Sequence, residues 1–263
     1  VSHLLATRFP QAWNARGAWT TRVVARHEQR LREDAETLEQ MNRELDAFSG
    51  RVAHDLRGPL STINLAASTL AKQAPAQEPT VAVLKRSVTR MQSIIEGLLK
   101  LSRVGARAPE ALAEPHAVAV SVEEDLQRRV KEIDGVLHVD VEPASVRCDE
   151  GFLREILWNL GENAVKYRRK DAPATIEVTG RTGPSRYELR VTDNGVGMSA
   201  EDARRIFDPF FRGKGTQSTP GTGLGLSIVK RAVEASGGRV AVESSEGEGT
   251  TFIVELPLAG SSA

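Results

Sequence analysis

A histidine and an aspartate stand side by side at positions 54 and 55, within the segment SGRVAHDLRGPL that runs from Ser49 to Leu60. A neutral imidazole is a competent nucleophile near pH 7, and a neighbouring carboxylate can fix its tautomer. His54 and Asp55 are therefore a candidate nucleophile and its partner. The simpler interpretation is a histidine that merely faces solvent on a helix.

Two asparagines, Asn159 and Asn163, are four residues apart, a spacing that places both amides on one face of a helix. An amide oxygen is a hard ligand that suits Mg²⁺, an ion that usually keeps waters and bridges phosphates. Lys166 follows Asn163 by about one turn and could offset phosphate charge. The pattern indicates a phosphate and magnesium site, although by itself it also fits a solvated polar face.

The run Asp193-Asn194-Gly195-Val196-Gly197-Met198 follows a predicted strand. A carboxylate at that place can accept a hydrogen bond from an exocyclic amine such as that of adenine. Glycine lets the backbone approach a flat ring closely. An ordinary turn at the end of a strand is the alternative.

A third run, Gly221-Thr222-Gly223-Leu224-Gly225-Leu226, opens a predicted helix. Glycine-rich backbone at the start of a helix can cradle a phosphate. The spacing is neither that of a dinucleotide-binding fingerprint nor that of a P-loop, since no Gly-Lys-Ser/Thr follows. Between the second and third runs, the phenylalanine-rich segment 206–213 leads into small polar residues. We interpret that tail as a mobile lid, with a solvated surface loop as the alternative.

The elements that must position these residues fall into two kinds. Apolar residues recur at steps of three and four before and through the histidine segment, imperfectly at two places; the series is His27, Leu31, Asp34, Leu38, Met41, Leu45, Phe48 and Val52. Such a seam needs a partner helix, and a dimeric coiled coil is favoured over packing within one domain. The helix is expected to reach about Lys72, with a kink at Pro59, before Ala74–Pro79 breaks it.

A second helix keeps the same rhythm at Val81, Leu84, Val88, Met91, Ile95 and Leu98. Two helices joined by a short loop form an antiparallel hairpin, and two hairpins form a four-helix bundle. Beyond a linker, Gly105–Pro115, we expect a strand over 117–122 and helices over 122–133 and 151–169, the last with Asp149 as its N-cap. Strands over 136–141, 175–181, 187–192, 239–244 and 250–256, with a helix after the glycine run, predict an α+β sandwich with a mixed sheet.

Composition excludes several classes of function. The 263 residues include 35 Lys and Arg against 35 Asp and Glu, which gives no support to broad nucleic-acid binding. The one cysteine, Cys148, excludes an internal disulfide framework and a cysteine-rich zinc site. No apolar run approaches the length of a membrane span. We therefore expect a cytoplasmic location, and the parent protein could be anchored to a membrane by a segment upstream.

Taken in their order, these motifs resemble those of the sensor histidine kinases of two-component systems. The asparagine helix, the Asp-Gly-x-Gly run, the phenylalanine segment, the Gly-x-Gly-x-Gly run and a final Gly247-x-Gly249-Thr250-x-Phe252 strand resemble that family's ATP-binding domain. HDLRGPL resembles the family's H-box, on its dimerisation and phosphoacceptor helix. The resemblance covers about residues 45–258.

The resemblance implies a protein-histidine kinase that phosphorylates His54 from Mg-ATP and passes the phosphoryl group to a response regulator. It implies Asp55 as the acidic neighbour of the nucleophile, Asn159 as a polar catalytic residue near the γ-phosphate, and Asn163 as the Mg²⁺ ligand. The implied ATP-binding residues are Asn163, Lys166, Tyr167, Asp193, Gly195, Gly197, Arg212, Gly221, Gly223, Leu224, Gly225 and Thr250. It also implies a homodimer, a separate receiver domain as partner, and a sensor domain upstream of Val1.

One position departs from the family's pattern. The family commonly carries Thr or Asn four residues after the histidine, where the side chain helps to hydrolyse phospho-aspartate on the partner. In this chain that residue is Gly58, which predicts weak phosphatase activity.

Three alternatives stay open. An ATPase of the gyrase, Hsp90 and MutL type would need a Glu base at the position where this chain has Asn159. A catalytically silent dimeric scaffold that binds ATP would not need the intact motifs. An anti-sigma serine kinase would lack the helical hairpin that precedes the ATP-binding domain. We expect an upstream remnant over residues 1–19, a coiled coil over 20–48, the dimerisation and phosphotransfer hairpin over 49–104, a linker over 105–116, the ATP-binding domain over 117–258 and a tail over 259–263.

Overall fold

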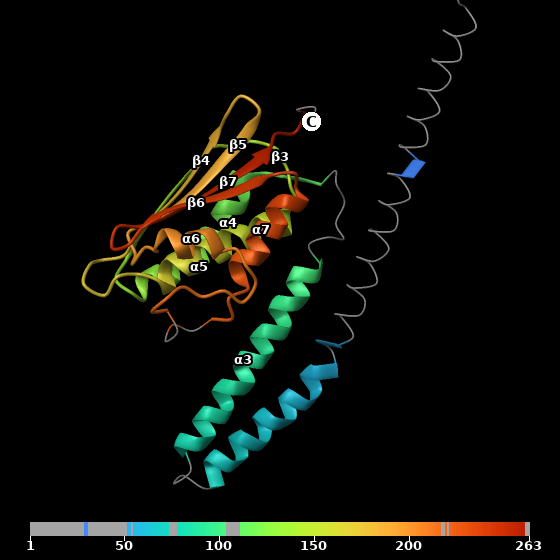
Figure 1. Ribbon diagram of the computed structural model, residues 1–263, viewed down its shortest axis with the longest axis vertical. Helices are drawn as coiled ribbons and strands as arrows, with labels where there is room; N and C mark the ends of the chain where they lie inside the picture. The colour runs from blue at the N-terminus through green and yellow to red at the C-terminus, as the bar shows by residue number, and fades with distance from the viewer. Residues whose placement is uncertain are drawn as a thin grey trace, which may run out of the picture. The chain divides into compact units, whose positions relative to one another are not determined.

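The computed structural model describes residues 29–30, 52–53, 55–73, 78–103, 111–216, 219 and 221–260 (Figure 1). The chain divides into two compact units, Val1–Ala47 and Phe48–Ala263, and nearly all the described residues belong to the second unit. The predicted remnant over residues 1–19, most of the predicted coiled coil, His54, half of the predicted linker and most of the predicted tail lie outside the described residues.

Two helices form the first part of the second unit. Residues 55–73 are helical across Pro59, and α3 runs from Glu78 to Arg103. Apolar residues of these helices form two series at steps of seven. One series is buried within the chain and comprises Ala53, Leu60, Ala67, Val81 and Val88; the other is exposed and comprises Leu56, Ile63, Leu70, Leu84, Met91 and Leu98. Two apolar stripes, of which only one is covered, are typical of helices that also pack against a partner.

The second part is a five-stranded sheet in the order β2-β4-β5-β7-β6, in which only β2 and β4 are parallel. Helices α4, α5 and α7 pack on one side of it (Figure 1). A two-stranded ribbon, β1 with β3, closes one end. The bounds are β1 Leu112–Ala113, α4 Pro115–Lys131, β2 Val136–Val141, β3 Val146–Arg147, α5 Glu150–Lys166, β4 Thr175–Thr182, β5 Arg186–Asp193, α6 Ala200–Arg205, α7 Gly225–Ala235, β6 Arg239–Ser245 and β7 Gly249–Pro257.

The predicted mixed-sheet α+β domain after a helical region is confirmed, and one predicted element is wrong. Residues 117–122 were expected to form a strand, yet they belong to α4. Their alternating valines and alanines are compatible with either element, but Val118, Val122, Leu126 and Val130 are buried at steps of four on the helix. Pro115 at the first turn fits a helix start, because its missing N–H needs no partner there.

The core of this domain lies between the sheet and the three helices. It contains Leu153, Ile156, Leu157 and Leu160 of α5, facing strand residues such as Val254. Tyr187 is fully buried and donates its hydroxyl hydrogen to the Glu142 carbonyl oxygen at 2.7 Å. The opposite face of α5 is left to carry polar residues.

Candidate functional site

Helix α5 presents the two asparagines on the face that points away from the core. The Asp149 side chain caps the helix by accepting a hydrogen bond from the Phe152 N–H at 3.1 Å, as predicted. The Asn159 Nδ2 donates to the Glu155 carbonyl oxygen at 2.7 Å and lies 3.4 Å from the Glu155 Oε2. The Asn163 side chain lines the cavity described below, where its amide oxygen can meet a ligand.

Asp193 ends β5 and is a buried carboxylate, with 8% of its surface exposed. Its Oδ1 accepts a hydrogen bond from the Gly195 N–H at 2.8 Å, and Thr250 stands opposite it on β7. Burial raises the pKa of Asp193 to about 6, although hydrogen bonds from the Gly195 and Thr250 backbone lower it in part. This carboxylate is therefore charged at neutral pH and ready to accept a further hydrogen bond.

Glycine is required at position 197 for two reasons. Its φ of +63° is a conformation that other residues rarely adopt, and a Cβ there would lie 1.9 Å from the Ser245 carbonyl oxygen. At Gly195 a Cβ would lie 2.5 Å from the Tyr167 carbonyl oxygen. The run after Asp193 is thus pressed against the backbone of β6 and the end of α5, as the short spacing of its glycines predicts.

The third glycine run joins the phenylalanine segment to α7. The Phe210 N–H donates to the Gly223 carbonyl oxygen at 2.9 Å, and a Cβ on Gly223 would lie 2.7 Å from the Phe210 carbonyl carbon. A Cβ on Gly225 would lie 2.7 Å from the Asn159 Oδ1. The run therefore crosses directly over α5, where its backbone N–H groups at the start of α7 could receive a phosphate.

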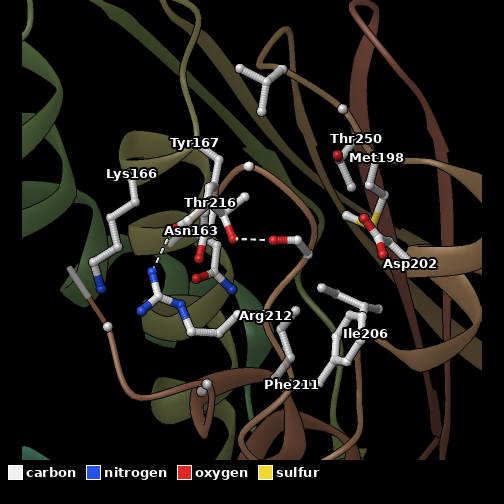
Figure 2. A pocket seen from close by; sticks show the side chains of 18 of the residues that line it. Asn163, Lys166, Tyr167, Met198, Asp202, Ile206, Phe211, Arg212, Thr216 and Thr250 are labelled. Atoms are coloured by element: carbon white, nitrogen blue, oxygen red, sulfur yellow. Dashed lines mark hydrogen bonds between the residues drawn. The ribbon is translucent and has the colours of Figure 1, made fainter. Parts of the chain in front are cut away.

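Arg212, one of the ATP-binding residues that the resemblance implies, is bound into its own loop. Its Nη2 donates to the carbonyl oxygen of Thr216 (Figure 2) and to that of Thr219. Its buried Nε has no partner among the described residues. The Asp202 Oδ2 accepts a hydrogen bond from the Lys214 N–H at 3.1 Å and anchors the loop to α6. Arg212 lines the cavity, and its Nη2 must exchange these loop carbonyl oxygens for a ligand before it can bind one.

These elements enclose a cavity of about 560 Å³, a volume within the usual range for small-ligand sites (Figure 2). The predicted residues that line it are Asn159, Asn163, Lys166, Tyr167, Asp193, Gly197, Arg212, Gly221, Gly223, Gly225 and Thr250. Two predicted residues, Gly195 and Leu224, do not line the cavity, although residues next to each of them in the sequence do. Asp55 is exposed on the helix of residues 55–73 and does not line it either.

Sequence reasoning missed much of the cavity wall. Apolar residues cover the side near Asp193 and supply a surface on which a flat ring could lie; they are Val196, Met198, Ile206, Phe211, Leu226 and Phe252. Asp202 and helix α6 were also missed. The sequence signal that could have predicted α6 is the Ser199-x-x-Asp202 spacing, which is typical of a helix start. In the structure the Ser199 Oγ caps α6 by accepting a hydrogen bond from the Asp202 N–H at 3.1 Å.

The donors available to a metal are few. Within the described ranges, no three His, Cys, Asp or Glu side chains cluster as a self-sufficient metal site would require. A single amide oxygen at Asn163 fits an ion that takes its other ligands from phosphates and water, as Mg²⁺ commonly does. The cavity can thus offer a carboxylate to a ring amine, an apolar slot to a ring, and glycine backbone with one amide to phosphates and their metal.

Two family descriptions match the chain. Residues 148–260 match "Histidine kinase-, DNA gyrase B-, and HSP90-like ATPase", and residues 44–107 match "His Kinase A (phospho-acceptor) domain". The first range contains the asparagine pair and the glycine runs, and the second contains His54 and Asp55.

No described helix combines the length and the apolar character that a membrane crossing needs.

Sensor histidine kinases are among the proteins similar to this chain. The sensor histidine kinase AruS of Pseudomonas aeruginosa is 35% identical over 252 residues, which cover 90% of this chain and 25% of AruS. The solved structure of a mycobacterial sensor histidine kinase, MprB, is 30% identical with a TM-score of 0.51 and covers 56% of this chain and 97% of its own. That of full-length ShkA in complex with AMPPNP is 30% identical with a TM-score of 0.64, covering 82% of this chain and 46% of its own. The chain thus spans a quarter of AruS and less than half of ShkA.

Proposed function

Because the chain belongs to the sensor histidine kinases of two-component systems, we propose that it transfers the γ-phosphoryl group of ATP to His54 and then to an aspartate of a response regulator. One observation carries the proposal: Asn163, Asp193 and the Gly221–Gly225 run, far apart in the sequence, line a single cavity. The ShkA structure, which contains the ATP analogue AMPPNP, supports ATP as the ligand.

Each nucleotide part has a residue suited to it. Asp193, charged at neutral pH, accepts a hydrogen bond from the adenine amine. Gly197 has no side chain that would occupy the space beside the ring. Asn163 would hold Mg²⁺, and the ion would supply positive charge to the phosphates. Lys166 and the backbone of the glycine run add positive potential, and Arg212 joins them when its Nη2 exchanges the loop carbonyl oxygens for a ligand.

Phosphoryl transfer needs a nucleophile aligned with the γ-phosphate and stabilisation of the charge that spreads over its oxygens. His54 is the nucleophile and Asp55 the base that holds its tautomer; both belong to the segment that matches the phosphoacceptor domain. Asn159, which lines the cavity where the glycine run crosses α5, is the polar residue that we assign to this chemistry on the nucleotide side.

The active form is a homodimer built through the hairpin. The exposed series at Leu56, Ile63, Leu70, Leu84, Met91 and Leu98 repeats every seven residues on two helices, and a second copy of the hairpin would cover it. In this assignment residues 49–104 are the dimerisation and phosphotransfer hairpin, residues 117–258 form most of the ATP-binding domain, and the receiver domain is a separate chain. Residues 111–116 join that domain in the fold, because β1 pairs with β3.

A hydrolase of the gyrase, Hsp90 and MutL type is disfavoured by the surroundings of Glu162, the carboxylate nearest Asn163 in sequence. The Glu162 side chain is paired with the Arg129 Nε at 3.0 Å and the Lys166 Nζ at 3.3 Å, and it does not line the cavity. It is therefore badly placed to take a proton from an attacking water.

Labelling with γ-labelled ATP and Mg²⁺ tests the proposal. The expected label is acid-labile and alkali-stable, and it disappears in the His54→Gln variant. Steady phosphate release without labelled protein would favour a hydrolase, and absence of both label and release would favour a silent ATP-binding scaffold.

A further inference from the structure

Helix α3 contacts the nucleotide-binding domain beside the cavity. Gly97 of α3 is buried against Leu224, and a Cβ on Gly97 would lie 2.7 Å from the Leu224 Cδ1 and 3.3 Å from the Leu224 Cβ. Ser93, about one turn earlier on α3, lines the cavity itself. The contact is therefore close, and a side chain at position 97 would require Leu224 to shift.

Leu224 is buried at this contact and lies outside the core cluster of the domain. Only 1% of Leu224 and 4% of Ile228 are exposed, yet neither belongs to the core cluster between the sheet and the helices. The two residues are one turn apart at the start of α7, the helix against which α3 packs. Because Leu224 stands between Gly223 and Gly225, a helix that holds Leu224 also holds the phosphate-binding run.

A second link reaches Asn159. The Lys100 Nζ, one turn after Gly97 on α3, binds both carboxylate oxygens of Glu155, at 2.7 and 3.0 Å. Glu155 precedes Asn159 by one turn of α5 and accepts hydrogen bonds from its Nδ2. Lys100 therefore holds the carboxylate whose Oε2 lies 3.4 Å from the Asn159 Nδ2, while the shorter bond of that nitrogen, at 2.7 Å, goes to the Glu155 carbonyl oxygen.

We propose that α3 positions the nucleotide site through two contacts, Gly97 with Leu224 and Lys100 with Glu155, which together form the α3 latch. The latch holds the glycine run and Asn159 in their binding geometry. Docking of the ATP-binding domain on α3 and binding of nucleotide therefore strengthen each other. Gly97, Lys100, Leu224 and Glu155 are positioning residues, since none of them lines the cavity. The proposal rests on the proposed function, because it takes Mg-ATP as the ligand of the cavity.

The physical reason is conformational entropy. A glycine-rich run loses much freedom when it orders around a phosphate, and a helix that already orders it reduces the loss on binding. Coupling between two binding events is reciprocal, so nucleotide must also favour the docked helix. The Lys100–Glu155 pair is partly exposed, with 50% and 33% of the two side chains accessible, and such pairs shift an equilibrium by about fivefold at most.

Charge reversal tests the latch in the whole 263-residue chain, with the dissociation constant of Mg-AMPPNP measured by calorimetry. We expect Lys100→Glu to weaken binding by about fivefold. Adding Glu155→Lys to that variant should recover most of the loss, which a general loss of stability would not do. The difference between wild type and Lys100→Glu should also shrink at high salt. Arg86→Glu, the same change of charge at an exposed site of α3, is the matched control and should bind as wild type does.

Gly97→Ala tests the apolar half. Alanine strengthens a helix, so a weaker affinity must arise from the collision with Leu224 and not from damage to α3. Gly58→Ala is the matched control, because a Cβ at Gly58 meets no atom within 4 Å. We expect Gly97→Ala to bind Mg-AMPPNP several-fold more weakly and Gly58→Ala to bind it normally.

The outcomes separate the latch from the proposed function. A wild-type chain that binds Mg-AMPPNP while Lys100→Glu and Gly97→Ala bind equally well would overturn the latch alone. If Glu155→Lys does not restore the affinity lost in Lys100→Glu, the Lys100–Glu155 ion pair is not part of the latch. A wild-type chain that does not bind Mg-AMPPNP would overturn the proposed function and the latch together.

Discussion

Replacing the buried carboxylate of Asp193 by an amide should make the empty protein more stable while it weakens nucleotide binding. Burial raises the pKa of Asp193 to about 6 from an ordinary value of 3.8. A difference of about two pH units corresponds to a cost of about 3 kcal/mol for keeping this carboxylate charged at pH 7.5. An asparagine side chain at this position would avoid that cost and could still accept the Gly195 N–H, but it would lose its second acceptor near Thr250, a loss of about 1 kcal/mol. The Asp193→Asn chain should therefore gain about 2 kcal/mol in its free energy of unfolding.

The pH dependence has a definite sign. The native state holds the Asp193 proton more tightly than the unfolded state, so the stability of the wild type, measured against Asp193→Asn, rises as the pH falls through 6 towards 4. At pH 5 the advantage of the variant should have shrunk by about 1.4 kcal/mol. Urea unfolding of both chains without nucleotide, at pH 7.5 and pH 5, measures the two differences.

Nucleotide binding should move in the opposite direction. The amide would present its NH₂ donors to the adenine amine, which leaves a hydrogen bond unmade and should weaken Mg-AMPPNP binding by about tenfold or more. Added nucleotide should then stabilise the wild type but hardly stabilise Asp193→Asn. A variant that is less stable than the wild type at pH 7.5, or a difference that does not change with pH, would refute the buried-charge reasoning.

Three further predictions concern the hairpin and the lone thiol. Met91→Lys places a charge in the exposed apolar series and should shift the chain from dimer to monomer in sedimentation experiments, whereas Thr89→Lys, on an exposed part of the same helix, should leave the dimer intact. Gly58→Thr meets open space, so the chain should fold normally and gain ADP-stimulated phosphatase activity towards its response regulator; robust activity in the wild type would contradict the role assigned to Gly58. Burial raises the pKa of the Cys148 thiol to about 11, so alkylation at pH 8 should be about a hundredfold slower in the native chain than in urea, and equal rates would show the thiol to be accessible.

The sequence alone predicted the motif residues of the cavity, because their chemistry is written in short motifs. Asn159 and Asn163 share a helix face by spacing alone, and the glycines at 195, 197, 223 and 225 predict close approach of backbone. The heptad rhythm of the two hairpin helices was likewise local information. The spacing could not tell which apolar stripe the chain covers by itself and which it leaves for a partner.

The tertiary structure decided the features that depend on contacts between distant residues. Whether 117–122 became a strand or a helix was settled by packing against the sheet, since its alternating apolar residues suit both elements. The raised pKa of Asp193 follows from its burial, and the pairing of Glu155, the neighbour of Asn159 on α5, with Lys100 joins residues far apart in the sequence. Desolvation and hydrogen-bond partners are properties of the assembled fold, because residues far apart in the sequence supply them.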